Sequence, residues 1–339
     1  MNVDTVCSIV TVRVKLVRGK MSPKPSVVWV FTAYQTTSLK DNVRLNSSRN
    51  NQYIPVNVNR IVAFNISSNF IYIISADNNN HMKLREYIHN PYALLDPMYM
   101  VDDTPNKWGK AVVVGKHCVD DYTEFHDISR EPDAPRVMVH AKTDLDPPSA
   151  VPSRVILFTN NVLTPTRNVR CLPMGGDFRS KRERQLVKPP IDKPQLLYCN
   201  FSVTTHPDRI IAKNMLESLP FATMRHMGTF MDYPMSRVCF FEELWAHKYA
   251  ACPRGNAVDT FRFWDTLVGG SVPIVVVEHL CDDFYNLPLV KLPNVESYAS
   301  LSIGWLEREY THLLDCTFNF DMLTSGYWEH IVASSHLGA

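Results

Sequence analysis

Two apolar runs joined by a segment with helical periodicity constrain the fold of this 339-residue chain most strongly. The first run is 249–252 (YAAC), and the second is 272–277 (VPIVVV). Short, continuous apolar runs rich in β-branched residues are typical of buried strands. Between the runs, apolar side chains recur at helical spacing, at Phe261, Trp264, Leu267 and Val268. The segment therefore predicts a strand–helix–strand unit.

The predicted helix, 259–268, has both start and stop signals. Asp259 or Thr260 can cap its N-terminus, and Gly269-Gly270 can end it through a left-handed residue. Glycine is scarce here, with 12 glycines against 23 prolines, so each glycine position is informative. Gly255 lies in the turn before the helix, where it leaves room for a close backbone approach.

The same criteria predict further elements along the chain. Buried strands are expected at 27–32, 70–75, 111–114, 136–140, 154–159 and 195–201. Helices are expected at 206–219, with Thr204 or Thr205 as N-cap, and at 233–247, 302–316 and 324–332. Alternating strands and helices imply an α/β fold with parallel strands, in which ligands bind at the carboxyl ends of the strands.

A charged stretch at 179–184 (RSKRER) runs into a proline-rich stretch at 188–194. No aromatic residues interleave with the cations, so we interpret 179–194 as a solvated linker rather than a nucleic-acid patch. It divides the chain into an N-terminal domain, 1–178, and a C-terminal domain, 195–320. We expect a final helix, 321–339, to pack back on the N-terminal domain.

The composition excludes several classes of protein. Lys plus Arg is 35 and Asp plus Glu is 34, so no whole-chain field favours nucleic acid or an anionic membrane. No stretch approaches the roughly 20 apolar residues that span a bilayer. Basic residues interrupt the apolar run at the start, so no signal peptide is predicted. We therefore expect a soluble, cytoplasmic protein without a membrane span.

The turn after 249–252 collects residues that suit an anion. Arg254, Gly255 and Asn256 form the turn, and the helix N-terminus behind it carries a partial positive charge. Arg262 adds a guanidinium that can grip a phosphate, with Asp265 three residues further on. These parts suit a site for a diphosphate and a sugar. They equally suit an ordinary capped helix with an Arg–Asp pair, and residue chemistry alone leaves both interpretations open.

The stretch 252–276 (CPRGNAVDTFRFWDTLVGGSVPIVV) resembles the donor-binding signature of exostosin-like glycosyltransferases, the family 47 type. The matching positions are Pro253, Gly255, Asp259, Thr260, Arg262, Trp264, Gly270, Pro273 and Val275. Two positions depart from the pattern. The second glycine of the turn is Ala257, and the acid expected to hold the ribose is Asp265 in place of Glu.

Three segments upstream also resemble the short soluble viral and microbial members of that family. They are 140–144 (HAKTD), 172–178 (LPMGGDF), and 198–204 (YCNFSVT) followed by 206–209 (HPDR). The resemblance covers 136–280. It implies two Rossmann-like domains that face each other across a cleft, the GT-B arrangement. It also implies a glycosyltransferase that moves a sugar from a nucleotide-diphosphate donor, a UDP-sugar, to a glycan hydroxyl, with no cofactor required.

The resemblance implies a role for each residue of the donor site. The donor-binding set is Asn200, Ser202, Thr204, Arg209, Pro253, Arg254, Gly255, Asn256, Asp259, Thr260, Arg262 and Asp265. Arg262 also counts as catalytic, because it stabilises the leaving diphosphate. An inverting transfer needs a general base from the N-terminal domain, for which Asp144 is the first choice and Asp103 the second.

Two alternatives stay open, and a third is excluded. Asp144-Leu-Asp146 is a D-x-D sequence, which binds Mg²⁺ or Mn²⁺ in the other large glycosyltransferase architecture. The departures at Ala257 and Asp265 suit a relative that binds a glycan or nucleotide without turnover. No G-x-G-x-x-G follows a predicted strand, which excludes a Rossmann oxidoreductase.

Overall fold

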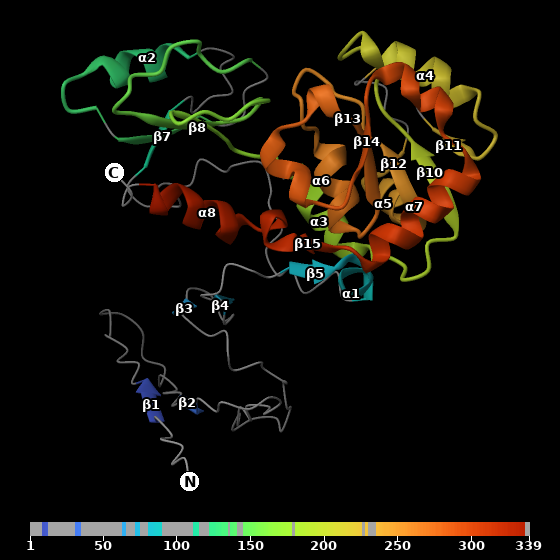
Figure 1. The fold of residues 1–339 in the computed structure, drawn as a ribbon, viewed down its shortest axis with the longest axis horizontal. Helices are drawn as coiled ribbons and strands as arrows, with labels where there is room; N and C mark the ends of the chain where they lie inside the picture. The colour runs from blue at the N-terminus through green and yellow to red at the C-terminus, as the bar shows by residue number, and fades with distance from the viewer. Residues whose placement is uncertain are drawn as a thin grey trace, which may run out of the picture. The chain divides into compact units, whose positions relative to one another are not determined.

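The computed structural model describes part of the chain, and that part divides into two compact units, 1–79 and 80–339 (Figure 1). The described residues are 9–12, 31–34, 63–65, 72–74, 81–89, 111–114, 122–134, 136–140, 145–177, 180–225, 228–229 and 235–335.

The first unit contributes two antiparallel strand pairs to this description. Strand β1 (Ile9–Val12) pairs with β2 (Phe31–Tyr34), and β3 (Ala63–Asn65) pairs with β4 (Tyr72–Ile74). The predicted strand 70–75 corresponds to β4. The predicted strand 27–32 overlaps β2 at its last two residues, and its other residues lie outside the described part.

The second unit holds two parallel sheets, of which the alternation of strands and helices beyond residue 195 predicts the second. The first has the order β6-β7-β8-β9, with every neighbouring pair parallel. Its strands are β6 (Val112–Val114), β7 (Val137–His140), β8 (Ile156–Thr159) and β9 (Val169–Cys171), and helix α2 (Thr123–Arg130) joins β6 to β7. Strands 111–114, 136–140 and 154–159 are thereby confirmed, whereas β9 was not predicted.

The second parallel sheet has the order β11-β10-β12-β13-β14. Its strands are β10 (Gln195–Cys199), β11 (Ala222–Met224), β12 (His247–Ala251), β13 (Val272–Val276) and β14 (Val290–Leu292). Strand β13 is buried along its whole length, which matches its continuous apolar sequence, and β12 is buried at the apolar residues 249–251. The fold is therefore mixed α/β with parallel sheets.

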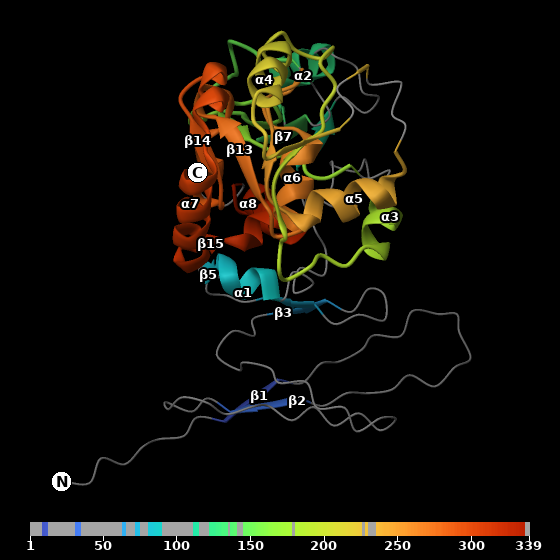
Figure 2. The ribbon, with the colours of Figure 1, turned by 90° about the vertical axis from the view of Figure 1, so that its right-hand side faces the viewer.

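Three helices connect the strands of this sheet. They are α4 (Asp208–Glu217), α5 (Arg237–Ala246) and α6 (Phe261–Val268). The chain turns from β10 to β11 in one direction and from β11 through β12 to β13 in the other. With right-handed crossovers, this strand order puts α4 on the face opposite to α5 and α6. Figure 2 shows α5 and α6 together on one side of β13.

The helix ends test the predicted caps. The Thr260 hydroxyl caps α6 by accepting a hydrogen bond from the backbone N–H of Phe263, and Gly270, with φ +70°, follows its C-terminus. This confirms Thr260 as the N-cap of the helix and Gly270 as the left-handed residue that ends it. Helix α4 begins after Pro207 without a side-chain cap, so the cap predicted at Thr204 or Thr205 is wrong.

The segment 179–194 differs from the solvated linker that its charges predict. It contains helix α3 (Lys181–Leu186), which contacts α5, and the side chain of Arg184 is buried. The Lys193 ammonium is also buried and donates hydrogen bonds to the carbonyls of Trp245 (2.8 Å) and Gly269 (2.9 Å), at the C-termini of α5 and α6. These charges can be buried because each has a partner: Arg184 forms an ion pair with Asp265, and Lys193 bonds to carbonyls at helix ends. The boundary predicted at 179–194 lies inside the second compact unit.

The remaining elements complete the second unit. They are β5 (His81–Lys83), α1 (Leu84–His89), α7 (Ile303–Asp315), β15 (Thr317–Asn319), α8 (Ser325–Ser334) and the 3₁₀ segments η4 (Val277–His279), η5 (Asp282–Asn286), η6 (Val295–Ser300) and η7 (Phe320–Leu323). Helices α7 and α8 confirm the two predicted C-terminal helices. The Trp328 ring of α8 packs edge-on against Phe284, which lies in η5 between β13 and β14 of the second sheet.

One large hydrophobic cluster includes side chains from both parallel sheets, among them Val139 and Phe158 from the first and Leu197 and Ile274 from the second. Hydrogen bonds also join the loops of the two parallel sheets. The Val258 N–H donates to Asn161 Oδ1 (2.7 Å), and the Met174 N–H donates to Asp259 Oδ2 (2.7 Å). Asn161 and Met174 follow the carboxyl ends of β8 and β9. These ends therefore meet the loop that follows β12.

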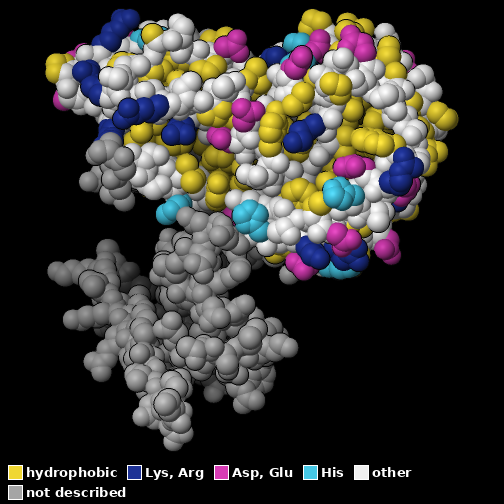
Figure 3. All heavy atoms as spheres, viewed as in Figure 1, with side chains coloured by type: hydrophobic (Ala, Val, Ile, Leu, Met, Phe, Trp, Pro, Cys, Tyr) yellow, Lys and Arg dark blue, Asp and Glu magenta, His cyan; other side chains and the backbone are white. Residues whose placement is uncertain are grey.

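The surface drawn in Figure 3 carries basic and acidic side chains interspersed over the second unit, which agrees with a formal net charge of +1. None of the described helices combines the length and the apolar character needed to cross a bilayer.

Candidate functional site

The strand order of the second sheet reverses between β10 and β12. From β10 the chain passes to the neighbour on one side, β11, and then crosses to the other side, to β12. The loops after β10 and β12 therefore lead to opposite sides of the sheet from its carboxyl ends. In open parallel sheets, ligands bind at such a switch point. Most of the sequence-predicted donor residues lie in these two loops, at 200–204 and 253–256.

Arg209, at the start of α4, ties the two loops together. Its side chain is 6% exposed. Its Nε donates to the carbonyl of Arg254 (2.7 Å), Nη1 to Ser202 (2.9 Å) and Nη2 to Pro253 (3.3 Å). The guanidinium is thus bound on three sides by backbone carbonyls and holds the two loops together.

Gly255 leaves room for this arrangement. A Cβ atom at this position would lie 2.9 Å from Arg209 Nη2, closer than a Cβ contact normally allows. Glycine therefore lets the turn approach the buried guanidinium. Ala257, where the family pattern has a second glycine, needs no such freedom, because Asn161 is the one non-glycine residue with a positive φ in the described part of the chain.

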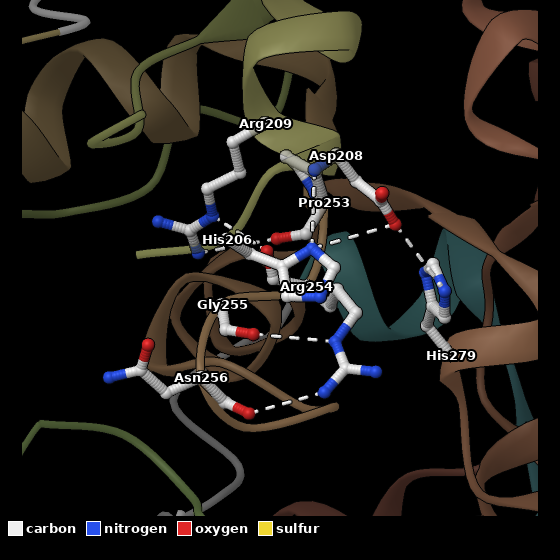
Figure 4. A network of polar contacts seen from close by, with 8 residues as sticks. All are labelled: His206, Asp208, Arg209, Pro253, Arg254, Gly255, Asn256 and His279. Atoms are coloured by element: carbon white, nitrogen blue, oxygen red, sulfur yellow. Dashed lines mark hydrogen bonds and ion pairs between the residues drawn. The ribbon is translucent and has the colours of Figure 1, made fainter. Parts of the chain in front are cut away.

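Arg254 lies on the more open side of the turn. Its Nε donates to the carbonyl of Gly255 (3.3 Å) and its Nη2 to that of Asn256 (3.2 Å), which folds the side chain back along its own loop (Figure 4). The side chain is partly exposed, and Asn256 is exposed. Arg254 is therefore positioned to meet a ligand from solvent.

Arg262 extends from the first turn of α6 toward the same strand ends. Its Nε is buried and has no hydrogen-bond partner among the described residues. The guanidinium carbons of Arg262 and Arg209 lie 6.0 Å and 5.9 Å from the ring centre of Phe201. A buried donor without a partner costs free energy, and an anion at this point would satisfy it.

The arginines raise the local positive potential. Burial, and then the charge of Arg262, lower the pKa of Arg209 to about 9. No carboxylate of the described residues forms an ion pair with Arg209, Arg254 or Arg262. The concentration of cationic charge at the strand ends is what a polyanion needs.

Two histidines and one aspartate border Arg254. His206 follows β10, Asp208 opens α4, and His279 ends η4 after β13, so three strand ends contribute (Figure 4). Asp208 Oδ2 lies 3.5 Å from His206 Nδ1 and 3.5 Å from His279 Nε2. Burial, and then the charge of Arg254, lower the pKa of both histidines. We call Arg209, Arg254, Arg262, His206, Asp208 and His279 the strand-end cluster.

The predicted donor residues that follow β10 differ in burial. Asn200 is fully buried and its Nδ2 donates to the Tyr198 hydroxyl (2.8 Å). The hydroxyls of Ser202 and Thr204 are 2.9 Å apart, with Thr204 exposed. Ser202 and Thr204 thus lie at the rim of the strand-end cluster, whereas Asn200 lies beneath it.

Asp259 and Asp265 differ most from expectation, because both carboxylates face the protein interior. Asp259 is 1% exposed, and its Oδ2 also accepts a hydrogen bond from Trp264 Nε1 (2.7 Å). Asp265 is 3% exposed, and its Oδ1 lies 2.5 Å from Arg184 Nη2. Burial raises the pKa of Asp265 to about 6, against the charge of Arg184, which lowers it. Burial and the contact with Arg184 of α3 keep the Asp265 carboxylate inside the protein, so a ribose contact by Asp265 does not fit this geometry.

The two predicted catalytic aspartates, Asp144 and Asp103, lie outside the described residues. The second acid of the D-x-D sequence, Asp146, is exposed, and Asn161 Nδ2 lies 3.5 Å from its Oδ1. Asn161, with φ 64°, links this carboxylate to the loop after β12 through Val258. Within the described residues, no three His, Cys, Asp or Glu side chains are grouped to hold a metal ion.

Sequence reasoning gave no role to His206, Asp208 or His279. A signal was present, because Asp208 precedes Arg209 directly and His279 follows the predicted strand 272–277. Residues just beyond the carboxyl ends of parallel strands are where a ligand is expected.

The chain matches no protein-family model, and the comparison with curated proteins gives no match.

Proposed function

We propose that the protein is a glycosyltransferase that moves a sugar from a nucleotide-diphosphate donor, such as a UDP-sugar, to a hydroxyl of a glycan acceptor. The observation that carries this proposal is the strand-end cluster at the switch point of the second sheet. Its arginines have no carboxylate partner among the described residues, and the buried Arg262 Nε lacks a hydrogen bond.

The cluster suits the leaving group of such a transfer. The bond between the sugar C1 and the diphosphate oxygen breaks, and its electron pair stays on the diphosphate. The acceptor oxygen forms the new bond to C1, and a general base takes its proton. Negative charge therefore grows on the diphosphate, where Arg254, Arg262 and the N-terminus of α6 stabilise it.

The two parallel sheets support a GT-B arrangement of two Rossmann-like domains, with the acceptor on the first. The carboxyl ends of β8 and β9 meet the loop after β12 through Asn161–Val258 and Met174–Asp259. An acceptor bound at the first sheet would then lie beside the donor. In this proposal Asp144 is the base of an inverting transfer and Asp103 its alternative.

Arginines can supply the charge neutralisation that a divalent cation supplies in other transferases. We therefore propose transfer without a required metal. The competing role for Asp144-Leu-Asp146 as a Mg²⁺ or Mn²⁺ site predicts activity that is lost with a chelator and restored by either ion.

Binding to a panel of nucleotide-diphosphate sugars tests the proposal by titration calorimetry. The Arg262→Ala variant should weaken binding of the preferred donor about 10- to 100-fold, the range for a charge-assisted hydrogen bond. The matched control is Arg308→Ala, which removes an exposed arginine from α7 and should leave affinity unchanged. Both variants should melt close to wild type, since Arg262 forms no ion pair with a described residue.

Turnover separates an enzyme from a binding protein. Wild type should release nucleoside diphosphate from the donor faster in the presence of an accepted glycan. Tight donor binding without release would favour a non-catalytic relative. Failure of wild type to bind any nucleotide sugar, or equal binding by wild type and Arg262→Ala, would contradict the proposal.

A further inference from the structure

Asp208 is the carboxylate of the strand-end cluster that a ligand can reach. Its side chain is 24% exposed, and those of His206 and His279 are 25% and 19% exposed. In contrast, the carboxylates of Asp259 and Asp265 are buried. A ligand held by Arg254 would therefore have Asp208 beside it (Figure 4).

The hydrogen-bonding capacity of this carboxylate is largely unused by its neighbours. The Asp208 backbone N–H donates to His206 Nδ1 (3.3 Å), so Nδ1 accepts and has no proton to give to Asp208 Oδ2. His279 Nε2 lies 3.5 Å from the same oxygen, a long distance for a hydrogen bond. An ionised carboxylate has about four acceptor positions. Because its side chain is 24% exposed, Asp208 keeps acceptor positions that a ligand can reach.

The surroundings of Asp208 favour a neutral hydrogen-bond donor over a cationic one. Burial and Arg254 lower the pKa of both imidazoles, which disfavours their charged forms. Arg254 and Arg209 supply positive charge next to the carboxylate, so an additional cationic ligand group would be repelled. A neutral group with two O–H donors meets both conditions, and a vicinal diol offers two hydroxyls at the spacing of the two carboxylate oxygens.

We propose that Asp208 binds a vicinal diol carried by the same ligand whose phosphates bind Arg254 and Arg262. This inference rests on the proposed function, and it assigns to Asp208 the contact that the sequence pattern assigns to Asp265. A nucleotide sugar carries such a diol on its ribose and on its hexose.

The test compares wild type with Asp208→Asn, which keeps the shape of the side chain and removes its charge. Affinity is measured by titration calorimetry for four probes: pyrophosphate, 2′-deoxy-UDP, UDP and UDP-glucose. The matched control is Glu278→Gln, an exposed carboxylate next to His279. Thermal melting checks that each variant folds.

The substitution Asp208→Asn should change affinity in opposite directions for probes with and without the diol. Asp208→Asn removes a negative charge near the phosphates, so pyrophosphate and 2′-deoxy-UDP should bind equally well or more tightly. UDP and UDP-glucose should bind about tenfold more weakly if the ribose supplies the diol, because a site built for hydroxyls loses affinity when its acceptor is removed. If the hexose supplies it, UDP-glucose alone should weaken. Glu278→Gln should change none of these differences.

Three results would overturn the inference. Equal changes for all four probes would show a general electrostatic effect of Asp208. Unchanged binding of UDP and UDP-glucose by Asp208→Asn would show that Asp208 does not contact the diol. In that case, binding of pyrophosphate by wild type would still leave the proposed function standing. Failure of wild type to bind any of the four probes would remove the proposed function and the inference together.

Discussion

The residues Arg262 and Asp265 lie three positions apart on one short helix, yet they belong to two different regions of the molecule. Asp265 forms a buried pair with Arg184 of α3, with both side chains under 5% exposed. Arg262 joins the strand-end cluster, where no described carboxylate pairs with it. The two regions have similar side chains, but only the first has its charges matched.

The difference separates stability from ligand binding. A buried charge whose partner is removed destabilises the fold, because the remaining charge has lost its solvation. Like charges held together at a strand end repel each other, and an anionic ligand relieves that repulsion. Changes in the Arg184–Asp265 pair should therefore alter unfolding, and changes in the strand-end cluster should alter binding.

The largest effect is expected from Asp265→Ala. It leaves Arg184 buried without its partner and should lower the free energy of unfolding by about 3–5 kcal/mol. Chemical denaturation monitored by circular dichroism measures this. The double variant Arg184→Met/Asp265→Leu is the control, since it removes both charges and should recover most of the loss. If Asp265→Ala instead melted like wild type but lost UDP binding, Asp265 would belong to the ligand site.

A smaller effect is expected from Gly255→Ala. The new Cβ would meet Arg209 Nη2 at 2.9 Å, so the guanidinium must shift from the carbonyls that it holds. We expect a loss of about 1–3 kcal/mol in stability, as for overpacking, together with weaker nucleotide binding.

The control for this variant is Gly326→Ala in α8, where no atom lies within 4 Å of the added Cβ. Alanine favours a helix over glycine by roughly 0.5–1 kcal/mol, so Gly326→Ala should be neutral or stabilising. Equal effects of the two substitutions on melting temperature would show that Arg209 does not require glycine at position 255.

The smallest effect is a pH dependence of donor affinity. The pKa values of His206 and His279 are lowered by burial and then by Arg254, and Asp208, Arg209 and Glu278 also face them. A bound diphosphate offsets the charge of Arg254 and raises both pKa values, so the complex binds more protons than the free protein. Affinity should therefore rise as the pH falls through the region around 6.5, by about three- to tenfold.

UDP-glucose is the suitable probe for this measurement, because its phosphates stay ionised throughout that range. Calorimetry in buffers of different ionisation enthalpy should also report proton uptake on binding. His206→Asn and His279→Asn should each flatten the profile. An affinity that stays constant or falls with decreasing pH would mean that the imidazoles do not sense the ligand.

Much of the local structure could be predicted from the sequence. Continuous apolar runs identified β12 and β13, and helical spacing with Thr260 and Gly270 set the ends of α6. These features depend on neighbours within a few residues, which the sequence displays directly. The position of Arg254 and Gly255 just beyond a strand end was accessible for the same reason.

Other features depend on residues far away in the chain. The reversal of strand order between β10 and β12 arises from pairing between segments some 50 residues apart, and periodicity carries no record of which strands pair. The proximity of Asp208 to His279 likewise requires α4 and η4 to meet at one sheet edge.

The sequence by itself determined the parallel α/β character of the second sheet, the ends of α6 and the arginine-bearing turn after β12. Only the tertiary structure decided which acid is buried and which is exposed. Arg184, 81 positions before Asp265 in the numbering, lies opposite it inside the protein and holds that carboxylate in the core. Burial and long-range pairing, rather than residue type, therefore separate the two aspartates, leaving Asp208 at the surface of the strand-end cluster.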